Sequence, residues 1–594
     1  MELTLIDWFI ILLYVAIAIF IGFRYKNQAS RSLADFFLGG RKLPWFIAGI
    51  SMVATTFAAD TPLAVTEMVS QHGISGNWLW WNMLIGGMLT TFFFADLWRR
   101  ANVLTELEFI EFRYSGKPAA FLRGFKSVYL GLFLNVLIIS WVNLALQSIL
   151  QVFFDIPADH LIWYIGGAML VASFYSTLSG LLGVAITDAI QFVIAMAGSI
   201  ILAVIVLSTE QVGGITGLKE QVPSWAFQFF PRIGSGGGDV ASTLTISLGA
   251  FLAYIGVQWW ASWYPGAEPG GGGYVAQRMM STKNERHATG ATLFFQIAHY
   301  AIRPWPWILV ALATLVLYPG LGEGEERLGY VMAIRDYLPP GLTGLLLVAM
   351  LAAYMSTIST QLNWGASFIV NDFYKRFLYK SDDAAEDNSR KRGERHYVLV
   401  SRVVTILIML ISLYVTTIVT SITQVWHFLL ECGAGLGLVL ILRWYWQRVN
   451  AWSEITATIV PFVVFAVAKY GYGLVFPESF FLTVGITTAA WLLVTFITPR
   501  TRYDVLRNFY SRVQPPGMWT VDEDTTREKN KRIPRLIACW LSSILFTYSI
   551  LFMIGKIIFM EWLRSGMWFA LALVGFFVFR GSIRKLYARS TPGA

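Results

Sequence analysis

The sequence has few of the residues on which soluble enzymes and disulfide-bonded domains depend. Charged residues make up 14% of its 594 positions, against roughly 25% in a typical globular chain, which excludes an ordinary soluble domain. The two cysteines, Cys432 and Cys539, both lie in apolar segments, so they indicate neither a disulfide framework nor a metal site. The six histidines are scattered along the chain, whereas a membrane-embedded metalloenzyme needs clustered ligands. We therefore expect no enzymatic activity and no transition metal.

Hydrophobic residues are what the chain has in abundance, at 56% of all positions. The charges are confined to short segments between apolar runs of about 20 residues, the length that spans a bilayer as a helix. The formal net charge of +9 comes from loops between these runs, which fits membrane topology better than nucleic-acid binding. The first 26 residues lack a basic start and a small-residue cleavage site, so we interpret them as a retained helix. The sequence predicts an all-α integral membrane protein of the plasma membrane, in bacteria the inner membrane.

The apolar runs predict about 15 membrane spans: 5–23, 44–70, 77–98, 120–153, 160–180, 185–208, 243–262, 288–318, 339–373, 398–421, 423–446, 451–472, 478–498, 536–558 and 566–580. Lysine and arginine concentrate in every second connection, so the positive-inside rule places the N-terminus outside and the C-terminus inside. Three regions follow: an extra helix and cytoplasmic loop at 1–43, a transport core at 44–446, and extra helices with a cytoplasmic loop 499–535 at 447–594.

Two of the predicted spans are interrupted. The second carries Asp60, Thr61 and Pro62 in its middle, and the seventh runs into the glycine- and proline-rich stretch ASWYPGAEPGGGG at 261–273. Broken helices at corresponding positions of two halves are typical of transporters with inverted repeats, which bind their cargo at the break. The two breaks are five spans apart, the offset that a five-plus-five repeat requires.

One span, Leu345–Tyr374, concentrates hydroxyl groups in its middle, at Ser356, Thr357, Ser359 and Thr360. Positions 356, 359 and 360 share one helical face, and 357 lies about 100° away at its edge. Such hydroxyls often bond back to their own helix or join two helices. Together with small neighbours at Ala352 and Ala353, they also provide the oxygen ligands of a hard cation. We predict an alkali-cation site at membrane depth.

Ionisable groups inside the apolar spans cost about 2.5–3.5 kcal/mol each on insertion scales, so they usually face the bundle interior. A structural ion pair or a side chain that snorkels to the interface is the alternative explanation.

The predicted cargo-binding residues near the two breaks are Asp60, Thr61, Trp81, Asn82, Gln258, Trp259, His299, Arg303 and Glu431. Aromatic faces with oriented polar groups suit a polyhydroxylated ring. The planar fork of Arg303 suits a carboxylate, unless Glu431 or Asp60 neutralises it, so a sugar or a sugar acid is expected.

Five stretches of the sequence resemble the sodium:solute symporter family, which includes bacterial sodium/sugar, sodium/proline and sodium/sialic acid transporters. They are FFLGGRKLPWFIAGISMVATTFAAD, TELEFIEFRY, SGLLGVAITDAIQ, YVAQRMMSTKNE and AAYMSTISTQLNWGASFIVNDFY, within roughly the first 450 residues. The resemblance implies a LeuT-type five-plus-five inverted repeat, with one extra N-terminal and about four extra C-terminal helices. It implies Na⁺ as the coupling ion without another cofactor. The implied partners are a small-molecule solute and the lipid bilayer, not nucleic acid, for a monomer or weak homo-oligomer.

The resemblance also implies two sodium sites. The first comprises the carbonyls of Ala54, Phe57 and Ala353 with the hydroxyls of Ser356 and Thr357. The second, found in some members, matches Asp188, Ser356, Ser359 and Thr360. The sequence departs from the family pattern at Leu107, which replaces a proline, and in the 261–273 extension. The stretches RPWPW and LRWYWQRVNAWSEI resemble subfamily features.

The function expected from these observations is sodium-coupled symport of a small organic solute, a sugar or sugar acid, into the cell. A sodium- or proton-coupled amino acid or carboxylate symporter is the alternative, because Asp188 is able to carry a proton. A transporter-like solute sensor is a further alternative, but loop 499–535 is too short for a signalling domain.

Overall fold

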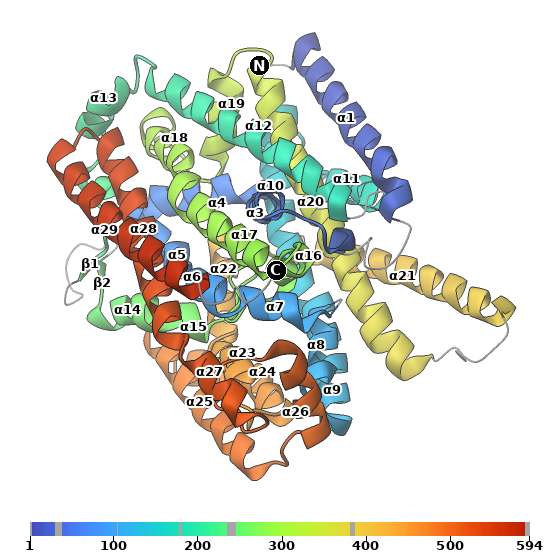
Figure 1. Cartoon of the computed structure of the whole chain (residues 1–594). Coiled ribbons are helices and arrows are strands. Elements are labelled where there is room, and N and C mark those ends of the chain that lie inside the picture. The colour runs from blue at the N-terminus through green and yellow to red at the C-terminus, as the bar shows by residue number, and fades with distance from the viewer. Residues whose placement is uncertain are drawn as a thin grey trace.

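The structure is a computed structural model of the chain, and it consists of packed helices that cross one another at various angles (Figure 1). It describes residues 3–29, 38–103, 105–157, 159–176, 181–233, 245–322, 324–379 and 387–587. The ends of the predicted spans 160–180 and 243–262 therefore lie partly outside the described residues.

The α-helices are α1 (Leu5–Ala29), α3 (Trp45–Thr55), α4 (Asp60–His72), α5 (Trp78–Trp81), α6 (Met83–Phe93), α7 (Ala95–Ala101), α8 (Glu106–Arg113), α9 (Gly116–Val128), α10 (Asn135–Phe154), α11 (Leu161–Ser176), α12 (Leu181–Leu207), α13 (Gly214–Gln221), α14 (Leu248–Leu252), α15 (Trp259–Ala261), α16 (Gly273–Ser281), α17 (Glu285–Ile297), α18 (Pro304–Leu317), α19 (Leu328–Tyr337), α20 (Leu342–Ser367), α21 (Asp387–Thr416), α22 (Ile422–Cys432), α23 (Leu436–Tyr445), α24 (Ala451–Ala466), α25 (Glu478–Ile497), α26 (Tyr503–Val513), α27 (Glu523–Asn530), α28 (Ile533–Ile558) and α29 (Trp562–Tyr587). Short 3₁₀ turns are η1 (Gly39–Arg41), η2 (Ile74–Asn77) and η4 (Ser224–Phe227). The π-helical turns are η3 (Tyr129–Leu134), η5 (Ala253–Gln258), η6 (Ala298–Ile302), η7 (Phe368–Leu378) and η8 (Val467–Gly471). Strands β1 (Arg232–Ile233) and β2 (Thr245–Ile246) form one short parallel pair.

Each predicted span coincides with a helix or with a series of consecutive helices, which confirms the all-α class. Within the described residues, nine helices are long and apolar enough to cross a membrane, or up to eleven if each of two bent helix pairs is one span. Three shorter apolar stretches are Leu5–Ile17, Leu161–Ala172 and Leu248–Ala261. The total of about 15 spans, the orientation and the boundaries of the three regions stay predictions.

The predicted interruption of the second span is confirmed. Helix α3 ends at Thr55, α4 begins at Asp60, and the two are bent by 58°. Pro62 lies in the first turn of α4, where a missing backbone N–H costs nothing because that group has no partner within the helix. The regular i→i−4 bonding of α3 extends to Thr56, whose N–H donates to Met52, whereas the N–H of Phe57 donates to Ala54 in a tighter turn.

The seventh predicted span is interrupted as well. Helix α15 ends at Ala261, Ser262 is extended, and the chain re-enters a helix only at Gly273. A further bend, of 55°, separates α22 from α23 and was not predicted. It requires glycine at Gly435, because φ there is +95° and an added Cβ would lie 2.6 Å from the Cβ of Thr487.

The C-terminal helices α28 and α29 pack as a hairpin against the core (Figure 1). Helix α28 contacts α6 and η6. Two of its side chains donate to backbone carbonyls of the core: Trp540 Nε1 to the oxygen of Ile85 at 2.9 Å and Tyr548 Oη to that of Trp81 at 2.8 Å. The hairpin is therefore attached to the short helices α5 and α6.

The predicted topology places loop 375–397 inside the cell, because it holds a cluster of lysines and arginines. Both native cysteines are buried, so a single introduced cysteine should dominate labelling. We expect Ser389→Cys to react with a membrane-impermeant maleimide only after permeabilisation. Glu325→Cys, in a loop predicted to lie outside, should react in intact cells. Labelling of Ser389→Cys in intact cells would overturn the topology.

Candidate functional site

Three helices meet at the carboxylate of Asp188, which lies on α12 and is 2% exposed. Helix α12 packs against both α3 and α20. Ser356 Oγ of α20 donates to Oδ1 at 3.0 Å, while Ser51 Oγ and Thr55 Oγ1 of α3 donate to Oδ2 at 3.4 and 3.5 Å. The structure thus places the predicted second-site residues Asp188 and Ser356 in direct contact.

Two other hydroxyls in the middle of α20 bond back to their own helix. Thr357 Oγ1 donates to the carbonyl of Ala353 at 3.0 Å, and Ser359 Oγ donates to that of Ser356 at 3.0 Å. The carbonyl of Ala54, at the end of α3, accepts the backbone N–H of Phe57 at 2.9 Å. A hydroxyl or carbonyl oxygen that takes part in one such bond keeps a lone pair, so back-bonding and cation ligation are compatible here. The ligand sets of both sodium sites stay predictions.

Arg278 of α16 is a further member of this cluster that the sequence analysis did not single out. Its Nη2 donates to Thr55 Oγ1 at 3.0 Å and its Nε to Ser51 Oγ at 3.5 Å, and the residue is 1% exposed. The same two hydroxyls donate to Asp188. Arg278 therefore compensates the buried carboxylate through two bridging hydroxyls, and a cation bound at Asp188 would compete with it. Its only signal in the sequence is the stretch YVAQRMMSTKNE.

We expect Asp188→Asn to lower the Hill slope for Na⁺ from above one to about one, because the change removes the only charged ligand of the second predicted site. A second ion adds about 2.3 kcal/mol of drive per 100 mV. The measurement is the Na⁺ dependence of uptake, with Asp336→Asn, which lies on α19 away from this cluster, as control. A wild-type slope of one would already contradict two bound ions.

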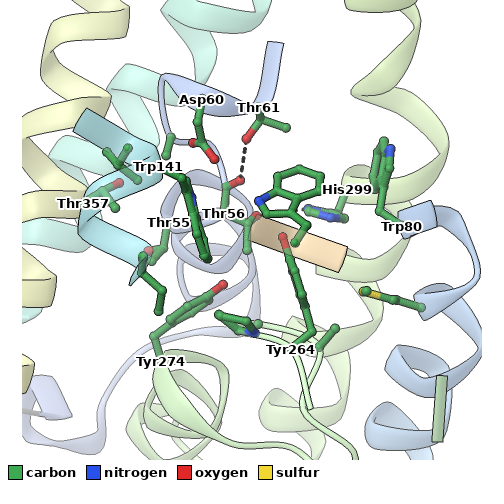
Figure 2. Close-up of a pocket in the computed structure, with 18 of the residues that line it drawn as sticks. Thr55, Thr56, Asp60, Thr61, Trp80, Trp141, Tyr264, Tyr274, His299 and Thr357 are labelled. Atoms are coloured by element: carbon green, nitrogen blue, oxygen red, sulfur yellow. Dashed lines mark hydrogen bonds between the residues drawn. The ribbon is translucent and has the colours of Figure 1, made fainter. Parts of the chain in front are cut away.

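Beside this cluster, a cavity of about 100 Å³ lies at the break between α3 and α4 (Figure 2). Of the predicted cargo residues it is lined by Asp60, Thr61, His299 and Arg303. The hydroxyl-bearing residues Thr357 and Thr360 of α20 line it too. Cavity and predicted sodium sites therefore share the helices α3 and α20.

Arg303 is held against the end of α3. Its Nη1 donates to the carbonyl of Val53 and to Thr56 Oγ1, both at 3.2 Å, and the guanidinium lies 5.0 Å from the ring centre of Trp307. Thr56 Oγ1 also lies 3.1 Å from His299 Nδ1. No carboxylate of the described residues forms an ion pair with Arg303. The Arg303 guanidinium is thus held in place by hydrogen bonds to Val53 and Thr56, and no described carboxylate neutralises its charge.

Four polar atoms of the cavity lining are buried without a hydrogen-bond partner in the part of the chain that the structure describes. They are Asp60 Oδ1, Arg303 Nε, Gln361 Oε1 and Trp426 Nε1. Unpaired buried polar groups are costly, and at a cavity wall they indicate sites for a ligand. Two donors and two acceptors are available to a cargo.

Aromatic side chains make up much of the remaining wall. Figure 2 shows Trp141 near Asp60, Tyr264 and Tyr274 at the opposite end, and Trp80 beside His299. Trp80 stacks on Tyr300 with ring centres 5.5 Å apart. His299 and Tyr300 lie in the π-helical turn η6, a local distortion that often accompanies functional sites. The sequence analysis missed Trp141, Tyr264, Tyr274 and Gln361; the signal for the two tyrosines was their position flanking the PGAEPGGGG stretch.

The other predicted cargo residues lie outside the cavity lining. Asn82 donates to the carbonyl of Trp78 at 2.7 Å, and Gln258 to that of Leu79 at 3.2 Å. Both amides therefore fix the backbone of the short helix α5. Trp81 on this helix is fully buried and packs edge-on against Phe552.

Two further predicted cargo residues also have structural contacts. Trp259 donates to the carbonyl of Ile255 at 2.8 Å and packs on Trp540. Glu431 accepts a hydrogen bond from Ser479 at 3.1 Å. Glu431 is therefore not the residue that neutralises Arg303.

The sequence profile of the Sodium:solute symporter family matches residues 36–461. The chain belongs to this family. Membership makes it a multi-pass plasma-membrane transporter of the sodium-coupled symport class, not an enzyme.

Individual members of the family differ in their solutes. The chain is 24% identical over 493 residues to a sodium/glucose cotransporter of Vibrio parahaemolyticus, covering 78% of this chain and 85% of the relative. It is 24% identical over 499 residues to a sodium/sialic acid symporter of Proteus mirabilis, covering 79% and 91%. A sodium/proline symporter of Staphylococcus aureus is 24% identical over 473 residues, covering 76% and 83%. Family membership thus leaves the solute of this chain open.

A solved structure of a Na⁺-coupled sialic acid symporter, in a substrate-bound outward-open state, superposes with a TM-score of 0.63 at 20% identity. The match covers 84% of this chain and 99% of that protein. The likeness confirms the predicted LeuT-type helical fold.

Proposed function

We propose that this symporter carries a sugar or a sugar acid into the cell together with Na⁺, by alternating access. The observation that supports this most is a set of four unpaired polar atoms in a cavity with aromatic walls, on Asp60, Gln361, Arg303 and Trp426. Hydroxyl groups of a sugar ring both donate and accept, so they can satisfy all four atoms, while aromatic rings cover the apolar faces of the sugar.

The proposed coupling uses two ions. The first is bound by the carbonyls and hydroxyls of Ala54, Phe57, Ala353, Ser356 and Thr357, and the second by Asp188 with Ser356, Ser359 and Thr360. All these ligands are oxygens, which suits an alkali cation and suits zinc or copper poorly. An ion that ties the end of α3 to α20 fixes two walls of the cavity at once, since Thr55 and Thr357 line it. Ion binding thereby prepares the cargo site.

An amino acid or another carboxylate is the second candidate cargo, and one observation favours it. Arg303 is buried beside the cavity without a carboxylate partner among the described residues, and its planar fork matches a carboxylate. A sugar acid meets both this requirement and the need for hydroxyls.

The test is a ligand-stabilisation screen of the purified protein with sugars, sugar acids and amino acids, each with and without Na⁺ and at several pH values. A ligand present at 100 times its Kd stabilises the folded state by about 2.7 kcal/mol, a shift that thermal unfolding resolves. We expect stabilisation by a sugar or sugar acid that requires Na⁺ and not a lower pH. If neither class binds at millimolar concentration, the sugar proposal fails.

A further inference from the structure

A second cavity, of about 900 Å³, shares no lining residue with the cargo site and lies at the predicted cytoplasmic ends of α23 and α25. Helices α26 and α27 cover this end of the bundle (Figure 1). Its lining includes Trp446, Gln447 and Arg448, from the stretch LRWYWQRVNAWSEI that resembles a subfamily feature. The proposed transport function gives this stretch no role.

The wall of this cavity is built by two segments that hydrogen-bond to each other. Met518 N donates to the carbonyl of Tyr445 at 2.6 Å, and Gln447 N to that of Met518 at 3.3 Å. The side chain of Gln447 bonds to Thr520 twice, at 2.7 and 2.9 Å. The loop between α26 and α27 is therefore fixed to the end of α23, which preforms the cavity.

Positive charge predominates in this cavity. Three arginines line it, Arg448, Arg500 and Arg527, against one carboxylate, Glu523. None of the three arginines forms an ion pair with a carboxylate of the described ranges. Burial, together with the nearby charge of Arg500, lowers the pKa of Arg448.

Two polar atoms at this wall lack a partner among the residues that the structure describes. Arg448 Nη2 donates to the carbonyls of Phe496 and Thr498 at 2.9 and 3.0 Å, but its Nη1 is buried and unpaired. Thr501 Oγ1 is likewise buried and unpaired. Donors in this arrangement are available to an anion with several oxygens.

The rim of the cavity is apolar and continuous with the end of a membrane-spanning helix. Phe496 in the last turn of α25 is 62% exposed, and Tyr503 and Met518 are 61% and 57% exposed. Helix α25 is long and apolar enough to span the bilayer. Arg500 follows the end of this helix by three residues, so we expect it at the level where lipid phosphates meet the protein surface.

We propose that this cavity binds a phosphate group, supplied by the head group of an anionic phospholipid or by a soluble phosphate ester. Guanidinium groups bind phosphate oxygens through paired, charge-assisted hydrogen bonds. The apolar rim accommodates the glycerol and first acyl carbons of a lipid, whereas a soluble ester occupies only the polar part.

The test measures Kd for the detergent-purified full chain with short-chain phosphatidylglycerol, with phosphatidylcholine of the same acyl length, and with glycerol 3-phosphate. Arg448 is left unchanged, because it donates hydrogen bonds to two backbone carbonyls and its replacement would disturb the fold. The variant combines Arg500→Gln with Arg527→Gln, which both change exposed residues. Arg502→Gln is the matched control, because Arg502 is close in sequence, is 70% exposed, pairs with Asp504 and does not line the cavity.

We expect phosphatidylglycerol to bind at least tenfold more tightly than phosphatidylcholine, and the double variant to lose that preference while Arg502→Gln keeps it. Glycerol 3-phosphate is the third ligand. If it binds the wild type and Arg502→Gln as tightly as phosphatidylglycerol does, but does not bind the double variant, a soluble ester is the source of the phosphate. Equal binding of both lipids without binding of glycerol 3-phosphate, or an unchanged Kd in the double variant, would overturn the site. Cargo binding should be unchanged in every variant, so this outcome is independent of the proposed transport function.

Discussion

Replacing Arg303 by glutamine is expected to weaken the binding of a sugar acid by well over tenfold while a neutral sugar loses little. Arg303 is 1% exposed, and its Nε is unpaired at the cavity wall. A hydrogen bond between charged partners contributes about 1.5–3 kcal/mol, and about 1.4 kcal/mol is a factor of ten in Kd. Glutamine keeps a donor for the carbonyl of Val53 but loses the charge. The measurement is Kd of the purified protein in saturating Na⁺.

The control for this experiment is Arg335→Gln, which changes an arginine on α19 that is paired with Asp336 away from the cavity. It should leave both classes of cargo unaffected. Equal losses for acidic and neutral cargo in Arg303→Gln would show that Arg303 acts only by holding the end of α3 through Val53 and Thr56.

Removing either hydroxyl of the first proposed sodium site, by Ser356→Ala or Thr357→Ala, is expected to weaken Na⁺ affinity by about tenfold or more, since each change removes one oxygen ligand of about 1.4 kcal/mol or more. The fold should persist, because Thr357 bonds only within its own helix and Asp188 keeps its contacts to Ser51 and Thr55 when Ser356 is replaced. The Na⁺ concentration for half-maximal uptake measures the effect.

Ser367→Ala, at the end of the same helix α20, is the matched control and should leave the Na⁺ affinity unchanged. Unchanged affinity in both site variants would place the ion elsewhere. A stronger effect of Ser356→Ala than of Thr357→Ala would agree with the contact of Ser356 to Asp188, because that hydroxyl serves both proposed ions.

One of the helix breaks could be predicted from the sequence, and another could not. Asp-Thr-Pro at positions 60–62 predicted the bend between α3 and α4, because proline is tolerated in the first turn of a helix but prevents the preceding helix from continuing through it. The bend before Gly435 depends on a backbone conformation and on the proximity of Thr487. Neither is a property of the local sequence, so that bend was missed.

The helical face on which a cargo residue lies was less predictable. Gln258 and Trp259 come at the end of the π-helical turn η5, where one extra residue per turn shifts the faces that regular helical spacing predicts. They point toward α5 and α28 instead of the cavity. Arg278 reaches Ser51 and Thr55 from a helix distant in sequence, a pairing that only the tertiary structure determines.

The attachment of α28 to the carbonyls of Trp81 and Ile85 has a mechanical consequence. Trp80, on the same short helix α5, forms part of the cavity wall. If α5 moves when the cargo is enclosed, these hydrogen bonds require the hairpin to move with it, and α29 has only 11% of its apolar window buried in protein. The hairpin would then displace lipid, and we expect a stiffer bilayer to slow the step that encloses the cargo.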